Sequence, residues 1–195
     1  MPLPKTRRLF VDVARKLFAK QGFEGTTMHD IATGAGKGRR TLYTYFKSKD
    51  EVFSSVIRQE LDRLYRELKE FVDQTLPPDE KLMKFVYIRL EAVKQVVERN
   101  GSLEAEFFRN IVLVERARLR FDRQEILLLQ RILKEGMLDG TFKVFDSRFT
   151  AVLIHSALKG MEVPYIRGHL GRTDAERSRR YRIVKQIIVD GIVRK

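Results

Sequence analysis

The chain has 195 residues, a formal net charge of +13, 43% hydrophobic residues and no cysteine. This length allows one domain or two small ones, and the hydrophobic content can support a packed core. The lack of cysteine excludes disulfides, thiol nucleophiles and cysteine-ligated zinc. No apolar h-region of a signal peptide follows the N-terminus, and no apolar run is long enough to span a bilayer, so we expect a soluble, cytoplasmic protein.

The charge is unevenly distributed along the chain. Residues 1–50 hold 11 Lys and Arg against 4 Asp and Glu, a net charge of +7. Residues 51–166 hold 19 of each sign, and residues 167–195 hold 9 against 3, a net charge of +6. A basic N-terminal block is typical of a nucleic-acid-binding unit.

Almost every segment shows helical periodicity, and no segment is predicted to be a paired strand. The predicted helices cover, in chain order, about residues 5–21, 27–33, 38–46, 48–74, 79–99, 102–136 (as two helices), 146–161 and 173–195. Capping-box patterns mark three starts, at Thr27, Ser48 and Thr173. Glycine and proline predict the ends, including a loop over 135–140 and a stop before Pro164.

The pattern predicts an all-α fold with two parts. Residues 1–47 are expected to form an N-terminal three-helix helix-turn-helix domain that binds DNA. Residues 48–195 are expected to form a C-terminal helical bundle of about six helices. The turn between the second and third helices is assigned to Gly34-Ala35-Gly36, because glycine can take the positive φ of a sharp turn.

The third helix has the features of a DNA-reading helix. Leu42 and Phe46, four residues apart, are predicted to anchor it to the first two helices. Arg39 and Arg40 offer guanidinium groups that suit guanine in the major groove, and Tyr43 can reach a thymine methyl or a phosphate. The alternative for such a face is a solvated cationic surface on an ordinary helical domain.

Residues 7–53 resemble the DNA-binding domain of the TetR family of bacterial transcriptional regulators. The matching segments are Ala14-x-x-Leu17-Phe18-Ala19-x-x-Gly22-Phe23, Thr26-Thr27-Met28-x-x-Ile31-Ala32-x-x-Ala35-Gly36 and Thr41-Leu42-Tyr43-x-Tyr45-Phe46-x-Ser48-Lys49. They cover about a quarter of the chain, and their combination is highly specific.

The resemblance implies roles for particular residues. The positions that reach bases in the family are Arg39, Arg40 and Tyr43, and the positions that contact the phosphate backbone are Thr27, Thr41, Tyr45 and Lys49. The chain departs from the family pattern at Lys37 and Gly38, where a small apolar residue and Ser are usual, and at Arg40, where Gly is frequent. We therefore also assign Lys37 to the DNA interface, as a charge near the phosphates.

The resemblance also implies a homodimer, because near-palindromic operators are read by two such units. A four-helix dimer interface is expected from the last two long helices. Its predicted residues are Leu153, Ala157, Gly160, Tyr181, Val184, Ile188 and Ile192. The alternative is that these residues pack within one subunit.

The family resemblance further implies that residues 48–195 form an effector-binding and dimerisation domain. Its small-molecule pocket would lie in the middle of the bundle, and an apolar or amphipathic ligand is the default expectation. The candidate pocket residues are Phe85, Phe107, Phe108, Phe121 and His155. Aromatic residues at helical spacing are more often core than pocket lining, so a ligand-independent DNA-binding dimer is the alternative function.

We expect no enzyme activity, no catalytic residues, no cofactor and no metal site. The chain has no His-x-x-x-His or Glu-x-x-His pair and no phosphate-binding glycine loop. The operator, the effector, the regulated genes, and whether binding represses or activates do not follow from the sequence.

Overall fold

The computed structural model describes residues 5–99, 111–144 and 146–167, with residues 176, 179, 182–183 and 185–192. The fold is all-α, as predicted. The helices are α1 (Lys5–Gln21), α2 (Met28–Gly34), α3 (Arg39–Tyr45), α4 (Lys49–Val72), α5 (Pro78–Arg99), α7 (Ile111–Leu138), α8 (Ser147–Ile166) and the π-helix η1 (Lys185–Val189). None of the described helices combines the length and the apolar character that a membrane-spanning helix requires.

The chain divides into two compact units. Unit 1 comprises Met1–Asp62 and Val96–Leu119, and unit 2 comprises Arg63–Gln95 and Arg120–Lys195. Helices α4, α5 and α7 therefore contribute residues to both units. The functional boundary between residues 47 and 48 stays a prediction, because a division by compactness does not assign DNA binding or dimerisation.

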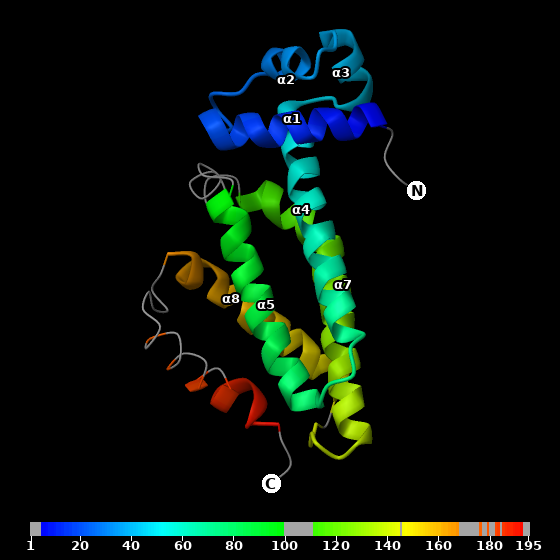
Figure 1. Ribbon diagram of the computed structural model, residues 1–195, viewed down its shortest axis with the longest axis vertical. Helices are drawn as coiled ribbons and strands as arrows, with labels where there is room; N and C mark the ends of the chain where they lie inside the picture. Colours follow the sequence, from blue (N-terminus) through cyan, green and yellow to red (C-terminus); the bar gives the residue numbers. More distant parts are fainter. Residues whose placement is uncertain are drawn as a thin grey trace. The chain divides into compact units, whose positions relative to one another are not determined.

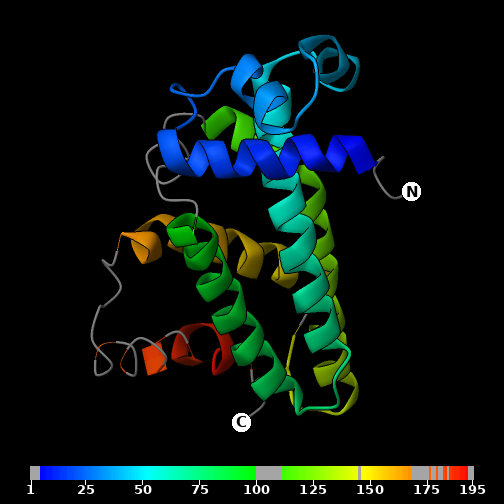
Figure 2. The same cartoon turned by 45° about the horizontal axis from the view of Figure 1, so that its top comes forward.

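Unit 1 builds one hydrophobic core between α1, α2, α3, the first half of α4 and the first part of α7 (Figures 1 and 2). Its centre is aromatic: the rings of Phe18, Phe23 and Phe53 lie 5.1–5.7 Å apart, centroid to centroid. Val114 and Ala117 of α7 are buried in the same core. The predicted anchors of α3 belong to it as well, since Leu42 is 0% and Phe46 is 1% exposed.

The ends of the short helices follow the predicted turn chemistry. Gly22 after α1 has a φ of 78°, and Gly36 between α2 and α3 has a φ of 60°, both in the region that favours glycine. Gly34 is needed for close packing instead: a Cβ there would lie 2.8 Å from a methyl group of Val13 in α1. The turn thus holds α2 against α1 while redirecting the chain into α3.

Two predicted helix ends are wrong. α7 continues through Gly136 to Leu138, because Gly136 leaves room for the ring of Phe142, which a Cβ would overlap. The loop instead turns at Gly140, with a φ of 81°. α8 likewise continues past Pro164 to Ile166, and the Arg167 amide closes its last turn by donating to the Val163 carbonyl at 3.1 Å.

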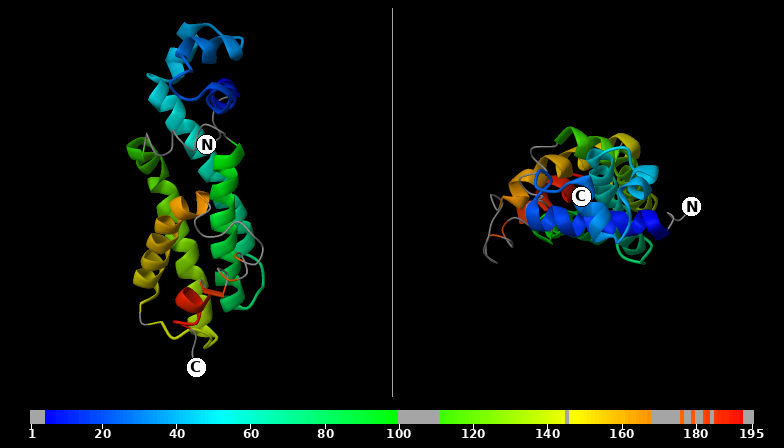
Figure 3. Two further views of the ribbon diagram at one scale, coloured as in Figure 1. Left: turned by 90° about the vertical axis from the view of Figure 1, so that its left-hand side faces the viewer. Right: turned by 90° about the horizontal axis from the view of Figure 1, so that it is seen from above.

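Unit 2 contains the last part of α4, most of α5, the second part of α7, and α8. Helices α5, α7 and α8 lie side by side there (Figures 1 and 3). The segment predicted as a final α-helix over 173–195 is described only in part. Residues 185–189 form a π-helix, closed by a hydrogen bond from the Asp190 amide to the Lys185 carbonyl at 2.9 Å. The following turn is held by the Lys143 amide, which donates to the carbonyl of Ile192 at 2.7 Å.

Candidate nucleic-acid interface and buried polar centre

The outward face of α3 is cationic and aromatic. Arg39 and Arg40 are exposed in its first turn, and Tyr43 leaves 45% of its surface accessible one turn later. Thr44 is also exposed on this face, four residues after Arg40. It was not among the predicted contacts because a single threonine gives no distinct sequence signal. Leu42 points into the core, and this fixes which side of the helix faces outward.

The C-terminal end of α3 is held by an arginine of α1. The guanidinium of Arg7 lies 4.7 Å from the centroid of the Phe46 ring and donates a hydrogen bond to Ser55 Oγ at 3.0 Å. A cation over an aromatic face contributes about 0.5–1 kcal/mol at partly exposed sites. Arg7 therefore fixes the end of α3 to the start of α1 and to α4.

The other predicted DNA-binding residues surround α3 with different degrees of exposure. Thr27 and Lys37 are exposed, whereas Thr41, Tyr45 and Lys49 are half-buried. The ring of Tyr45 packs beside an aromatic ring of α1, at a centroid distance of 6.0 Å. The ammonium of Lys49 is bound to the turn after α1 by a 2.7 Å hydrogen bond to a backbone carbonyl. Tyr45 and Lys49 thus have structural contacts in addition to any role at DNA.

The N-terminus of α2 is closed by the predicted capping box. The Asp30 amide donates to Thr27 Oγ1 at 3.1 Å, and the Thr27 amide donates to the Asp30 carboxylate at 2.9 Å. The Thr27 hydroxyl also donates to that carboxylate, and together these donors hold the pKa of Asp30 below its ordinary value. α3 begins at Arg39, and Gly38 before it, the N-cap residue, provides no side-chain cap.

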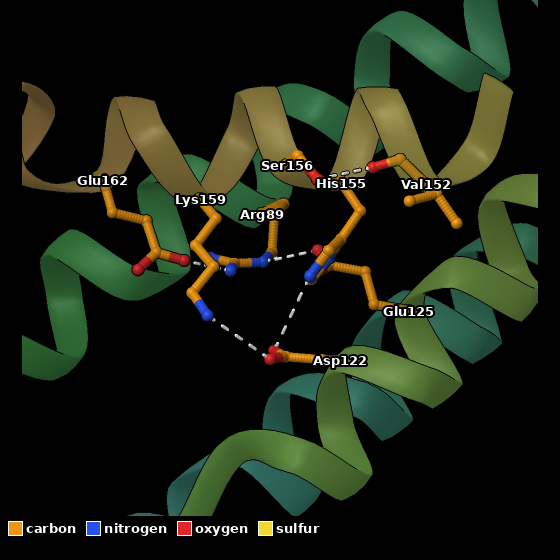
Figure 4. Close-up of polar contacts among 8 residues, drawn as sticks. All are labelled: Arg89, Asp122, Glu125, Val152, His155, Ser156, Lys159 and Glu162. Carbon is orange, nitrogen blue, oxygen red and sulfur yellow. Dashed lines mark hydrogen bonds and ion pairs between the residues drawn. The ribbon is translucent and has the colours of Figure 1, made fainter. Parts of the chain in front are cut away.

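Unit 2 has a charged centre that the sequence analysis did not anticipate. Arg89 of α5 is 0% exposed, and its Nε donates to Glu125 Oε1 of α7 at 2.5 Å. Its Nη2 donates to Glu162 of α8, so one guanidinium joins three helices (Figure 4). The available signal was an arginine on the apolar face of α5, four residues after Phe85, but its partners are 36 and 73 positions away in the chain.

His155 continues this charged centre along α8. Its Nδ1 lies 2.8 Å from Glu125 Oε2, and its Nε2 lies 3.9 Å from Asp122 Oδ1. Lys159, one turn further along α8, places its Nζ 3.7 Å from Asp122 Oδ2. Figure 4 shows the side chains of α8 and α7 pointing toward one another here. His155 was predicted as a pocket residue and lies, 6% exposed, in this network.

The remaining predicted pocket residues are core residues where the structure describes them. Phe85 is 0% and Phe121 is 3% exposed, and the Arg89 guanidinium lies 5.2 Å from the Phe121 centroid. Phe107 and Phe108 lie outside the described residues. Phe121 therefore packs against the charged centre and Phe85 is buried in the protein, and the pocket assignment stays a prediction.

The predicted dimer residues on α8 are accessible in the single chain. Leu153 is 54% exposed, and Ala157 and Gly160 are also exposed. Phe149, four residues before Leu153, is 61% exposed and extends the same helical face. Ile192 is another predicted dimer residue, and its carbonyl accepts a hydrogen bond from the Lys143 amide within unit 2. Tyr181, Val184 and the side chain of Ile188 lie outside the described residues.

The fold and the α3 face define a helix-turn-helix DNA-binding protein. Residues 10–56 match the family described as bacterial regulatory proteins, tetR family. The repressor KstR2 of Mycolicibacterium smegmatis is 32% identical over 145 residues, which are 72% of this chain and 69% of the relative. The chain belongs to the TetR family of bacterial transcriptional regulators and is not an enzyme.

Solved structures support the same fold. The fatty acid degradation regulator FadR from Bacillus halodurans has a TM-score of 0.71 at 19% identity, with 98% of each chain covered. The ketosteroid regulator KstR2 of Mycobacterium tuberculosis has a TM-score of 0.58 at 23% identity, covering 100% of this chain and 98% of that one. At these identities the similarity concerns the fold alone.

Proposed function

We propose that the protein is a homodimeric cytoplasmic repressor that binds a near-palindromic operator and leaves it when a small apolar or amphipathic ligand binds the C-terminal bundle. The observation that carries the proposal is the face of α3, where Arg39, Arg40 and Tyr43 are exposed above a fully buried Leu42. The two arginines are the proposed base readers. A rigid helix with guanidinium groups on its free side suits the major groove.

Contacts to the phosphate backbone complete the proposed interface. Lys37 and Thr27 are exposed beside α3, and the half-buried Thr41, Tyr45 and Lys49 border it. Such contacts fix the register of the protein on DNA without reading its sequence. The ring contact of Tyr45 and the hydrogen bond of Lys49 inside unit 1 support a second role, in which they hold α3 in place for base reading.

The exposed apolar face of α8 supports the homodimer. Phe149 and Leu153 are each more than half exposed, and Ala157 and Gly160 follow on the same face of the helix. Small residues allow two helices to approach closely, and an apolar face that is open in one subunit is the expected partner of its own copy in a two-fold dimer. Two reading helices about 34–36 Å apart then match successive major grooves.

The effector class is proposed by analogy with the similar proteins. One is a ketosteroid regulator and another regulates fatty acid degradation, so both names concern apolar or amphipathic molecules. Ligand would act by favouring a conformation whose reading helices no longer match the operator spacing.

Competition binding tests the DNA-binding half of the proposal. The full chain is titrated with the DNA next to its own gene and with random DNA, at physiological salt. We expect the specific DNA to bind at least a thousand-fold more tightly. Equal affinity for both would contradict the operator proposal, and candidate fatty acids and steroids that leave operator binding unchanged would contradict the effector proposal.

A ligand-independent DNA-binding dimer is the second candidate. It is favoured by the full burial of Phe85 and Phe121, since these side chains already pack against the protein itself. In that case the C-terminal bundle only dimerises, and operator affinity is insensitive to every small molecule tested.

A further inference from the structure

The geometry points to a binding site for a phosphate group in unit 1, formed by Arg7 of α1 together with Ser55 and Arg58 of α4. The two guanidinium groups converge on one atom, since Nη2 of each donates a hydrogen bond of 3.0 Å to Ser55 Oγ. Helix α1 crosses the first half of α4 in this region (Figures 1 and 2). None of the three residues belongs to the sets proposed above for DNA, the dimer or the effector.

The two arginines bring like charges together without a carboxylate between them. Two bonds of 3.0 Å to the same oxygen place the two Nη2 atoms no more than 6.0 Å apart. Within the described part of the chain, neither guanidinium forms an ion pair with a carboxylate at 4.0 Å or less. Burial, followed by the charge of Arg7, lowers the pKa of Arg58. A neighbouring like charge disfavours the charged form, and a bound anion offsets that cost.

Two carboxylates of α4 act on Arg58 only from a distance. The charges of Glu51 and Asp62 favour its protonated form, but their effects are smaller than those of burial and Arg7. Glu51 is engaged elsewhere, because its Oε2 accepts a hydrogen bond from the Lys47 amide at 2.8 Å, next to the start of α4. The counter-charge that the two arginines call for is therefore expected to come from a ligand.

The site offers donors from three side chains. A guanidinium carries five N–H donors, and among the described residues Arg7 and Arg58 each make one hydrogen bond, to Ser55. Ser55 is 5% exposed, and its hydroxyl accepts both bonds but donates none within the described part of the chain. Phosphate oxygens accept charge-assisted bonds of about 2.7–2.9 Å, and the guanidinium fork matches their geometry. One phosphate can therefore bridge both arginines and accept from Ser55.

A phosphate group is carried both by free small molecules and by the DNA backbone, and the position of the site favours a free molecule. Arg7 lies over the ring of Phe46, which is 1% exposed and belongs to the inward side of α3. Arg58 follows Lys49 by nine residues along α4, which is about 13.5 Å at 1.5 Å per residue. The site is thus on the core side of α3, opposite its reading face. Inorganic phosphate or a phosphate monoester fits it.

A bound phosphate would join α1 to α4 next to the end of α3. Because Arg7 already contacts both Phe46 and Ser55, fixing its guanidinium should also fix the C-terminal end of the reading helix. Phosphate should therefore strengthen operator binding. This consequence rests on the proposed DNA-binding function, whereas the existence of the site does not.

The binding experiment uses the full chain, freed of phosphate by dialysis, with inorganic phosphate as the probe in sodium chloride at constant ionic strength. Calorimetry should give one phosphate per chain. A ten-fold excess over Kd should raise the melting temperature by roughly 3 °C or more. Arg58→Met should lose at least about ten-fold in affinity, and Ser55→Ala several-fold, because each removes a donor to the anion.

Arg8→Met is the matched control. Arg8 is exposed on α1 beside Arg7, and the variant removes the same charge but should bind phosphate as the unaltered chain does. Phosphate also stabilises proteins generally, by exclusion from their surface, and that effect should be equal in the Arg58 and Arg8 variants. The melting temperature in chloride checks the folding of each variant. If Ser55→Ala does not fold, the Arg58 and Arg8 variants decide.

A second measurement distinguishes the two sources of phosphate. The DNA next to the gene is titrated with and without saturating phosphate at the same ionic strength. A free ligand should strengthen binding by the unaltered chain several-fold and leave Arg58→Met unaffected. If phosphate instead weakens DNA binding, and Arg58→Met weakens it without phosphate, the DNA backbone occupies the site and the free ligand is overturned.

The site itself is overturned if the chain binds no phosphate, if Arg58→Met binds it unchanged, or if Arg8→Met loses as much affinity as Arg58→Met. These calorimetric outcomes involve no DNA. A failure of the phosphate site is therefore distinguishable from a failure of the operator proposal.

Discussion

The ammonium of Lys49 donates a hydrogen bond to the carbonyl oxygen of Phe23 at 2.7 Å and lies 4.3 Å from the centroid of the ring of the same residue. The start of α4 is thereby tied to the turn after α1. We expect Lys49→Ala to lower stability by about 1 kcal/mol, or roughly 2–4 °C in melting temperature, since the site is half exposed. Lys47→Ala is the control, because Lys47 is exposed and should leave the melting temperature unchanged.

Arg40 should decide sequence preference. Because it is exposed on α3 and carries a bidentate donor, Arg40→Ala should cost about 1–3 kcal/mol on the operator and little on random DNA. Lys49→Ala should instead weaken both kinds of DNA and reduce the salt dependence of binding. Competition assays with single-base operator variants at fixed salt measure the difference. Equal loss of specificity in both variants would contradict this division of roles.

Leu153→Arg should disrupt the proposed dimer. It places a charge in the middle of the exposed apolar face of α8 without altering a buried residue of the single chain. We expect monomers by sedimentation at micromolar concentration, with normal helical content and much weaker operator binding. Leu138→Arg, at a side chain that is 89% exposed at the end of α7, is the matched control. A dimer that persists in the Leu153 variant would place the interface elsewhere.

Arg89 should be among the most sensitive positions for stability. Arg89→Met removes the cation between the buried carboxylates of Glu125 and Glu162, and breaking such a pair costs about 3–5 kcal/mol. Urea unfolding measures the loss. Arg131→Met, which breaks an ion pair with Asp73 at a side chain that is 48% exposed, should cost less than about 1 kcal/mol. Similar losses in the two variants would argue against the burial of the Arg89 charge.

The capping box of α2 should weaken in acid. The pKa of Asp30 is lowered from its ordinary value of 3.8 by the hydroxyl and amide of Thr27, so its stabilising effect is complete above that value. The effect is lost as the pH falls below 3.8 and through the lowered pKa of the folded state. Hydrogen exchange of the α2 amides should therefore lose protection in that range. Asp30→Asn should show no corresponding step.

Local chemistry explains which parts of the fold could be predicted. The bounds of α1 and the cap of α2 follow from residues within one turn of each end, such as Gly22 and Thr27. The inward side of α3 followed from the spacing of Leu42 and Phe46, which the structure confirms.

Long-range packing explains what could not be predicted. From the sequence, Gly136 is predicted to end a helix. In the structure it lies inside α7, where the absence of a side chain leaves room for the ring of Phe142. The sequence around Arg89 does not show that its charge is buried, because its partners Glu125 and Glu162 come from two other helices. In the same way, Asp122 and His155 come within 3.9 Å of each other only because α7 and α8 lie side by side.

The core of unit 1 also has a consequence for how the protein is made. Because Val114 and Ala117 are buried together with residues of α1 to α4, the DNA-reading unit cannot complete its core from its first 62 residues. A ribosome must translate well past the middle of the chain before these two side chains emerge. Until α7 has been synthesised, part of the apolar surface of residues 1–62 therefore remains exposed.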